Sequence, residues 1–156
     1  MSRLVQRICR KTKPSILIKS RSALLSDRTP DKCILNDNGY TILLINTFLQ
    51  QLVAAPEQVE FSDSMAVIDE NYEFIATEFN NGEQVNLSGQ NSGSCKIFAF
   101  AQLQHLNTAQ TLACFGRYYR DDVVKHPNAQ DHQNIRQFII HGWQGIDFKG
   151  QALFKK

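Results

Sequence analysis

An apolar segment behind a polar loop is the feature that most constrains the fold of this chain. Residues 97–101 read Ile-Phe-Ala-Phe-Ala and are apolar on every side. A helix with no polar face is buried in the middle of a domain. The preceding residues 88–94 contain no large apolar side chain and are predicted to form a loop. The sequence therefore predicts a central buried helix with Cys95 in its first turn.

Helical spacing of apolar residues predicts further helices on both sides of this segment. The predicted starts are Asn46 or Thr47, Ser62 or Asp63, Asn107 or Thr108, and Asp131. The last of these helices is expected to bury Ile135, Phe138 and Ile139 and to end at Gly142.

Residues 74–79 have strand composition, and residues 84–87 are read as a short returning strand after a turn at residues 80–82. Residues 146–148 and 152–154 are two short apolar pieces, with residues 149–150 between them as a candidate tight turn. Together these elements predict an α+β fold, a small and mainly helical single domain with a short antiparallel sheet or hairpins.

Charge divides the sequence near residue 45. Residues 1–45 hold nine basic and three acidic residues, a net charge of +6, whereas residues 46–156 have a net charge of −4. We therefore expect a basic, disordered extension over 1–45 and a folded domain over 46–156. The extension is also compatible with a mitochondrial transit peptide, a nucleic-acid-binding arm, or a stretch included by a wrong start codon.

Composition argues against several classes of protein. The mildly acidic body is a poor surface for phosphates, so no nucleic acid is expected to bind the core. No apolar run approaches the roughly 18 residues of a membrane span. The cysteines, Cys9, Cys33, Cys95 and Cys114, form no CxxC pair, which is atypical of a zinc ribbon or a disulfide scaffold. Reduced thiols in the cytoplasm are expected, and no cofactor.

Several segments, long and in the same order, resemble the HopJ family, small bacterial proteins named as type III secretion effectors. The similar segments are residues 59–63, 66–72, 79–82, 89–101, 111–116, 131–136 and 141–146. They lie between Asn46 and Leu153, and the first 45 residues have no counterpart. The resemblance implies a bacterial protein delivered into a host cell, with a host protein as its partner. It implies no established reaction.

Cys95 is the candidate nucleophile. A thiol in the first turn of a helix, beside Lys96, is expected to favour the reactive thiolate. His141 or His132 would act as the base, and Gln90 would donate to an oxyanion. The string from Gln90 to Cys95 is loosely similar to papain-type proteases, but Lys96 and the histidine spacing depart from that family. The alternative is a half-buried structural cysteine.

Polar residues at two places predict a recognition surface instead of chemistry. The expected contact residues are Gln90, Asn91, Ser94, His126, Asp131, His132, Asn134 and Trp143. Trp143 is either a core anchor, the interpretation that we favour, or an exposed docking residue. The histidine spacings do not put two imidazoles on one helical face, so no metal site is expected. We therefore favour a protein that binds an unknown protein partner, with a small cysteine-dependent hydrolase or acyl-transfer enzyme, or a cytosolic housekeeping protein, as alternatives.

Overall fold

The computed structural model describes residues 34–35, 41–42 and 45–156, with side chains from residue 45 onward. The chain separates into two units, Met1–Lys32 and Cys33–Lys156. The first unit lies outside the described residues, as do Cys9 and Cys33 and most of the expected extension over 1–45. The first described elements of the second unit are the short antiparallel strands β1 (Ile34–Leu35) and β2 (Thr41–Ile42).

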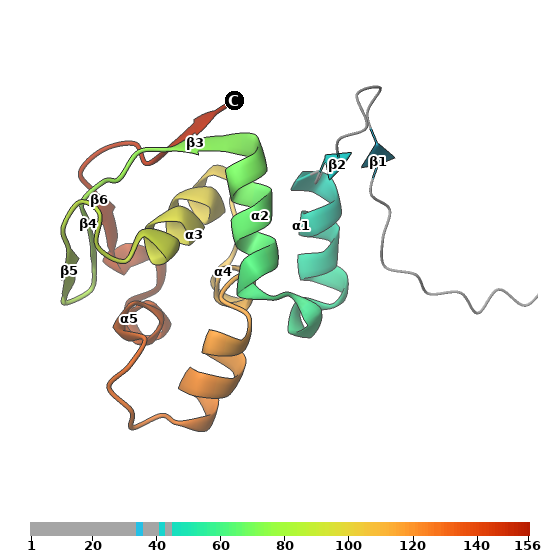
Figure 1. Cartoon of the computed structure of the whole chain (residues 1–156). Coiled ribbons are helices and arrows are strands. Elements are labelled where there is room, and N and C mark those ends of the chain that lie inside the picture. Colours follow the sequence, from blue (N-terminus) through green and yellow to red (C-terminus); the bar gives the residue numbers. More distant parts are fainter. Residues whose placement is uncertain (1–33, 36–40, 43–44) are drawn as a thin grey trace, which may run out of the picture. The chain divides into compact units, whose positions relative to one another are not determined.

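Helices make up most of this unit and confirm the predicted α+β class. They are α1 (Ile45–Ala54), η1 (Pro56–Gln58), α2 (Phe61–Asn71), α3 (Ser92–Leu103), α4 (Thr108–Ala113), η2 (Tyr118–Val123), α5 (Gln133–His141) and η3 (Gly142–Gly145). In Figure 1, α2 lies between α1 and α3, and it contacts both.

The central buried helix is α3, as predicted. Ile97, Phe98, Phe100 and Ala101 are all fully buried. The ring of Phe98 is surrounded by the rings of Phe79, Phe115 and Phe138, with centroid distances of 6.0, 5.5 and 4.9 Å. Through these aromatic contacts, the strand that contains Phe79, the segment after α4 and helix α5 all pack against Phe98. Helix α3 therefore determines where these elements lie.

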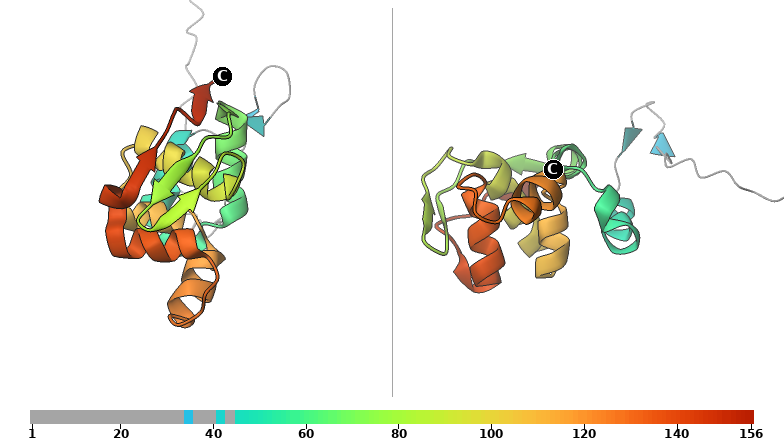
Figure 2. Two further views of the ribbon diagram at one scale, coloured as in Figure 1. Left: turned by 90° about the vertical axis from the view of Figure 1, so that its left-hand side faces the viewer. Right: turned by 90° about the horizontal axis from the view of Figure 1, so that it is seen from below.

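Two small antiparallel sheets flank the helices. Their strands are β3 (Tyr72–Phe74), β4 (Phe79–Asn81), β5 (Gln84–Asn86), β6 (Ile146–Phe148) and β7 (Leu153–Lys155). β3 pairs with β7, and β4 lies between β5 and β6. Figure 2 shows the β4–β5 hairpin in yellow-green beside the red C-terminal segment.

The single strand predicted over residues 74–79 is wrong. Phe74 ends β3 and Phe79 begins β4, in different sheets, and residues 75–78 form no strand. Their polar groups bond elsewhere: the Ile75 N–H donates to the Ala152 carbonyl and the Glu78 carbonyl accepts from Lys149 N–H, both at 2.9 Å. Residues 149–150, the candidate tight turn, lie between β6 and β7. These two strands do not form a hairpin with each other, because each pairs with a different strand. Distant partners, which local composition cannot reveal, determine both outcomes.

Helix boundaries differ from prediction where caps and glycine intervene. Glu60 rather than Ser62 or Asp63 precedes α2, in a reciprocal capping box with Asp63. The helix predicted to start at Asn107 or Thr108 is interrupted at Gly116, which has φ +56°. A Cβ at Gly116 would lie 2.5 Å from the Phe61 backbone nitrogen, so only glycine permits this approach. Gly142 ends α5 as predicted, whereas Ile139, expected inside, is 46% exposed.

Candidate functional site

The first turns of α3 and α5 line one cavity of about 330 Å³. Asn91 precedes α3 and His132 precedes α5, and both adopt left-handed backbone angles, with φ of 48° and 49°. Neither residue caps its helix with a side-chain hydrogen bond. Left-handed backbone angles are uncommon in residues other than glycine and cluster at functional sites. Two such residues at one cavity therefore make this cavity the candidate functional site.

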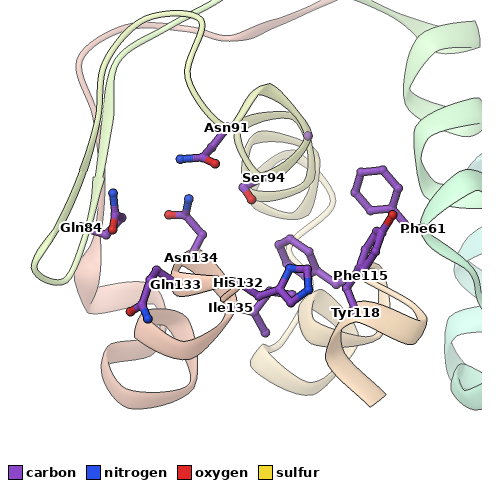
Figure 3. A pocket seen from close by; sticks show the side chains of 11 residues that line it. Phe61, Gln84, Asn91, Ser94, Phe115, Tyr118, His132, Gln133, Asn134 and Ile135 are labelled. Carbon is purple, nitrogen blue, oxygen red and sulfur yellow. The ribbon is translucent and has the colours of Figure 1, made fainter. Parts of the chain in front are cut away.

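One wall of the cavity is polar and is contributed by three elements. Figure 3 shows the Ser94 hydroxyl pointing into the cavity from α3, with Asn91 above it, Gln84 on the hairpin, and Gln133 and Asn134 on α5. Among the described residues, the Ser94 hydroxyl has no hydrogen-bond partner, so it is free to bind a ligand.

A network of asparagines holds this polar wall in place. The Asn86 side-chain oxygen accepts from Asn91 Nδ2 at 2.7 Å and from Asn134 Nδ2 at 2.8 Å. The Asn134 side-chain oxygen accepts from Asn86 at 3.1 Å and from Asn81 at 3.3 Å. Asn81 and Asn86 are fully buried and Asn134 is 5% exposed. Because buried amides are costly to leave unpaired, the network ties the hairpin to both helix starts.

The opposite wall is aromatic. Phe61, Phe115 and Tyr118 line it together with the His132 ring. The Tyr118 ring lies 5.1 Å from the His132 ring and 5.2 Å from the Phe61 ring, measured between centroids. The cavity therefore offers flat apolar contact on one side and hydrogen-bonding groups on the other, the usual character of a small binding site.

His132 is held by a carboxylate. Its Nε2 lies 3.2 Å from Asp122 Oδ2, and both side chains are about a third exposed, at 30% and 33%. Asp122 belongs to η2, a π-helical turn, a feature that often occurs at functional sites. The neighbouring Asp121 points elsewhere and pairs with Lys125, whose hydrogen bond lowers the pKa of the Asp121 carboxyl.

Four residues predicted from the sequence meet at this cavity: Asn91, Ser94, His132 and Asn134. The remaining residues that line the cavity were not predicted. No signal in the sequence singled out Phe61, Tyr118 or Gln84 as site residues. Asn81 lies in the predicted Asn-Asn-Gly turn, but its role in the buried network had no signal either.

The other predicted surface residues do not line the cavity. Gln90 accepts from the Leu87 N–H within its own turn, and Asp131 pairs with Arg136 at 2.7 Å. The Arg136 hydrogen bond holds the pKa of the Asp131 carboxyl below its usual range. The His126 side chain is exposed, and its carbonyl accepts from Arg136. Trp143 packs edge-on against Phe138 and donates to the Leu106 carbonyl, which matches the core reading of this residue.

The structure corrects the expected environment of Cys95. The side chain is 1% exposed, its thiol donates to the Thr77 carbonyl at 3.6 Å, and burial raises its pKa instead of lowering it. Lys96 turns away and pairs with Asp69 at 2.6 Å. Desolvation outweighs the helix dipole here, since a thiolate in the core loses its hydration. The other described thiol, Cys114, is also buried, and its pKa is raised to about 12.

The histidines proposed as its base lie elsewhere. His141 packs beneath the hairpin turn, where a Cβ on Gly82 would fall 2.2 Å from the His141 ring. His132 lines the cavity, which Cys95 does not. Among the described residues, neither histidine hydrogen-bonds to the Cys95 thiol. The nucleophile hypothesis for Cys95 thus stays a prediction whose structural premise is wrong.

Comparison with known proteins identifies the family. The model of the HopJ type III effector protein family matches residues 45–153. The chain belongs to this family. The match confirms the resemblance read from the sequence. The crystal structure of the unknown-function protein VPA0580 is similar, with 50% identity and a TM-score of 0.72, over 73% of this chain and 95% of that one. No curated protein matches the chain.

Two negative findings apply to the residues that the structure describes. Among them, no helix is both long and apolar enough to cross a membrane. Within the same residues, no group of three or more histidine, cysteine, aspartate or glutamate side chains is arranged to hold a metal ion. The cavity between α3 and α5 is therefore the site that the following proposals concern.

Proposed function

We propose that this HopJ-family chain is an effector that acts by binding a partner protein through the cavity at the starts of α3 and α5. One observation carries the proposal. Asn91, Ser94, His132 and Asn134, which the sequence singled out for recognition, come from two distant segments and line the same cavity. Recognition residues carried by the ends of packed helices are held rigidly, which lowers the entropic cost of binding.

The lining indicates the kind of group that binds. No lining residue is an aspartate, glutamate, lysine or arginine; the polar members are amides, hydroxyls and the His132 imidazole. A charged side chain entering this cavity would lose its hydration without gaining an ion pair. We therefore expect the partner to insert an uncharged side chain that packs on Tyr118 and hydrogen-bonds to the amide wall.

Gln133 offers a way to close the cavity without touching the asparagine network. Its side chain lines the cavity and donates only to the Gln130 carbonyl among the described residues. Gln133→Trp should fill the space, and Gln144→Trp, the same change at an exposed residue outside the cavity, is the matched control. Affinity capture from host-cell lysate, with quantitative mass spectrometry, compares both with the parent chain.

The expected result is at least one protein captured by the parent chain and by Gln144→Trp and lost with Gln133→Trp. Capture of the same proteins by all three chains, or of none by any, would contradict the proposal. Circular dichroism of each variant separates loss of the cavity from loss of the fold.

We further propose that the protein is made in the bacterial cytoplasm and delivered into a host cell by a type III system. The family match supports delivery, because the family is described as a type III effector. A translocation reporter fused after residue 156 tests this in strains with and without a working secretion system. Equal reporter signal in both strains would favour a cytosolic housekeeping role.

A further inference from the structure

Ser94 and Cys95 are neighbours in sequence but face opposite environments. Successive residues of an α-helix differ by about 100° in direction. Consequently the Cys95 side chain enters the core, where it is 1% exposed, while the Ser94 hydroxyl points into the cavity. The hydroxyl has no hydrogen-bond partner among the described residues. If this helix start carries a nucleophile, the geometry favours the serine over the cysteine.

The cavity also contains a base of the right kind. His132 lines it across from Ser94, and its Nε2 faces the Asp122 carboxylate at 3.2 Å. A carboxylate oxygen accepts hydrogen bonds, so we assign the ring proton in this contact to Nε2. The neutral ring then has an unprotonated Nδ1, which has no partner among the described residues and can take a proton.

We propose that Ser94, His132 and Asp122 form a nucleophile, base and orienting carboxylate for the hydrolysis of an uncharged ester. This activity goes beyond the binding function proposed above and shares its cavity. Serine, histidine and carboxylate in these roles recur on unrelated folds, and they are recognised by geometry and role, not by sequence order. No hydrogen bond joins Ser94 to His132 among the described residues, so proton transfer requires the two side chains to approach each other when substrate binds.

The reaction proceeds in two balanced halves. Ser94 Oγ bonds to the acyl carbon, its proton passes to His132 Nδ1, and the ester C–O bond breaks as that proton moves to the departing alcohol. Water then attacks the acyl-serine, gives a proton to His132, and releases the acid as Ser94 Oγ recovers that proton. Asp122 stabilises the imidazolium that forms in each half. No electrons are gained or lost, and water is the only co-reactant.

The surroundings define the substrate class. The first N–H groups of α3 lack helical partners and have no side-chain cap, so they can donate to the developing oxyanion. Phe61, Phe115 and Tyr118 form an apolar face for the acyl group. A cavity of about 330 Å³ with no carboxylate or ammonium in its lining fits a short, uncharged acyl ester.

A fluorophosphonate probe, which bonds to activated serines, tests the proposal on the full chain. We expect one adduct on Ser94, located by mass spectrometry, and none in Ser94→Ala. His132→Gln and Asp122→Asn should slow labelling by about 10²–10⁴-fold, the usual contribution of acid–base catalysis. Asp122→Glu keeps the carboxylate and should retain more of the rate than Asp122→Asn, a difference that a purely structural role would not produce.

Ser92→Ala is the matched control, because Ser92 lies one residue before the cavity lining of the same helix and its hydroxyl donates to the Gly89 carbonyl. It should label like the parent chain, and thermal melting checks that every variant is folded. Absence of a Ser94 adduct in the folded parent chain would overturn the proposal. Labelling that His132→Gln and Asp122→Asn leave unchanged would overturn it too. Since probe labelling needs no partner protein, its failure is distinct from a failure of partner capture.

Discussion

The two ends of α5 differ in how they use the same kinds of residue. At its start, His132 and Asn134 line an open cavity, and several polar groups are left available to a ligand. At its end, His141 packs under Gly82, and Trp143 packs on Phe138 and donates to the Leu106 carbonyl. We call the start of α5 its open end and the end next to Trp143 its closed end. The contacts at the closed end hold the helix in a fixed orientation, and this positions the cavity residues at the open end.

Removing the anchor at the closed end should have the largest effect. Trp143→Ala loses the ring contact with Phe138 and the hydrogen bond to Leu106. Because Trp143 is only half-buried, we expect a loss of about 3 kcal/mol of unfolding free energy, at the lower end of the range for buried tryptophan. Urea denaturation measures it, and a change below 1 kcal/mol would show that this end does not fix α5.

Breaking the asparagine network at the open end should cost less. Asn134→Ala removes one donor and one acceptor, so Asn86 loses both of its hydrogen bonds to Asn134, while Asn81 keeps its hydrogen bond to the Asn134 carbonyl. We expect a loss of about 2 kcal/mol. Gln133→Ala, the adjacent lining residue outside the network, should change stability by less than about 0.5 kcal/mol. Equal effects of the two variants would show that the network adds nothing to the stability of this end.

The reactivity of the cysteine thiols tests whether Cys95, which follows the cavity residue Ser94 in α3, is buried in the core. Burial raises the pKa of Cys95, and that of Cys114 to about 12. In the folded chain neither thiol should react with iodoacetamide at pH 8, whereas both should react once urea unfolds it. The unfolded thiols ionise near pH 8.5, before the folded ones, so stability should fall as pH rises from there toward 12. Rapid labelling of folded Cys95 would restore it as a candidate nucleophile.

The smallest effect is expected from removing residues 1–45. Both ends of α5 lie within 46–156, and the family match begins at residue 45. A chain that starts at residue 46 should therefore unfold cooperatively, with a midpoint within a few degrees of that of the full chain. Calorimetry provides the measurement, and a broad or missing transition would place residues 1–45 among the elements the domain needs.

Local signals predicted much of this fold. The all-apolar run at residues 97–101 identified the buried helix, and Gly142 identified the end of α5. Errors arose where distant parts of the chain decide the structure. Phe74 and Phe79 look like one strand until β7 and β6 pair with them separately. Gly116 interrupts a regular helical pattern because the backbone of Phe61 passes beside it.

The candidate site was predictable only in part, for the same reason. Asn91, Ser94, His132 and Asn134 were expected to belong to one recognition surface, but nothing in the sequence indicated that these four residues line a cavity while the other expected surface residues do not. The sequence also did not show which of the neighbouring side chains Ser94 and Cys95 points into the cavity. Sequence reasoning chose Cys95, whereas the rotation of α3 turns Cys95 into the core and Ser94 toward His132.

The pairing of β3 with β7 has a consequence for how the protein is synthesised. This pairing joins residues 72–74 to residues 153–155. During synthesis β3 therefore stays unpaired while about 80 further residues are translated, which takes several seconds. During that time the edge of β3, including Phe74, is open to other chains, a known route to aggregation. A nascent chain of this family is therefore expected to depend on a chaperone until its last strand emerges from the ribosome.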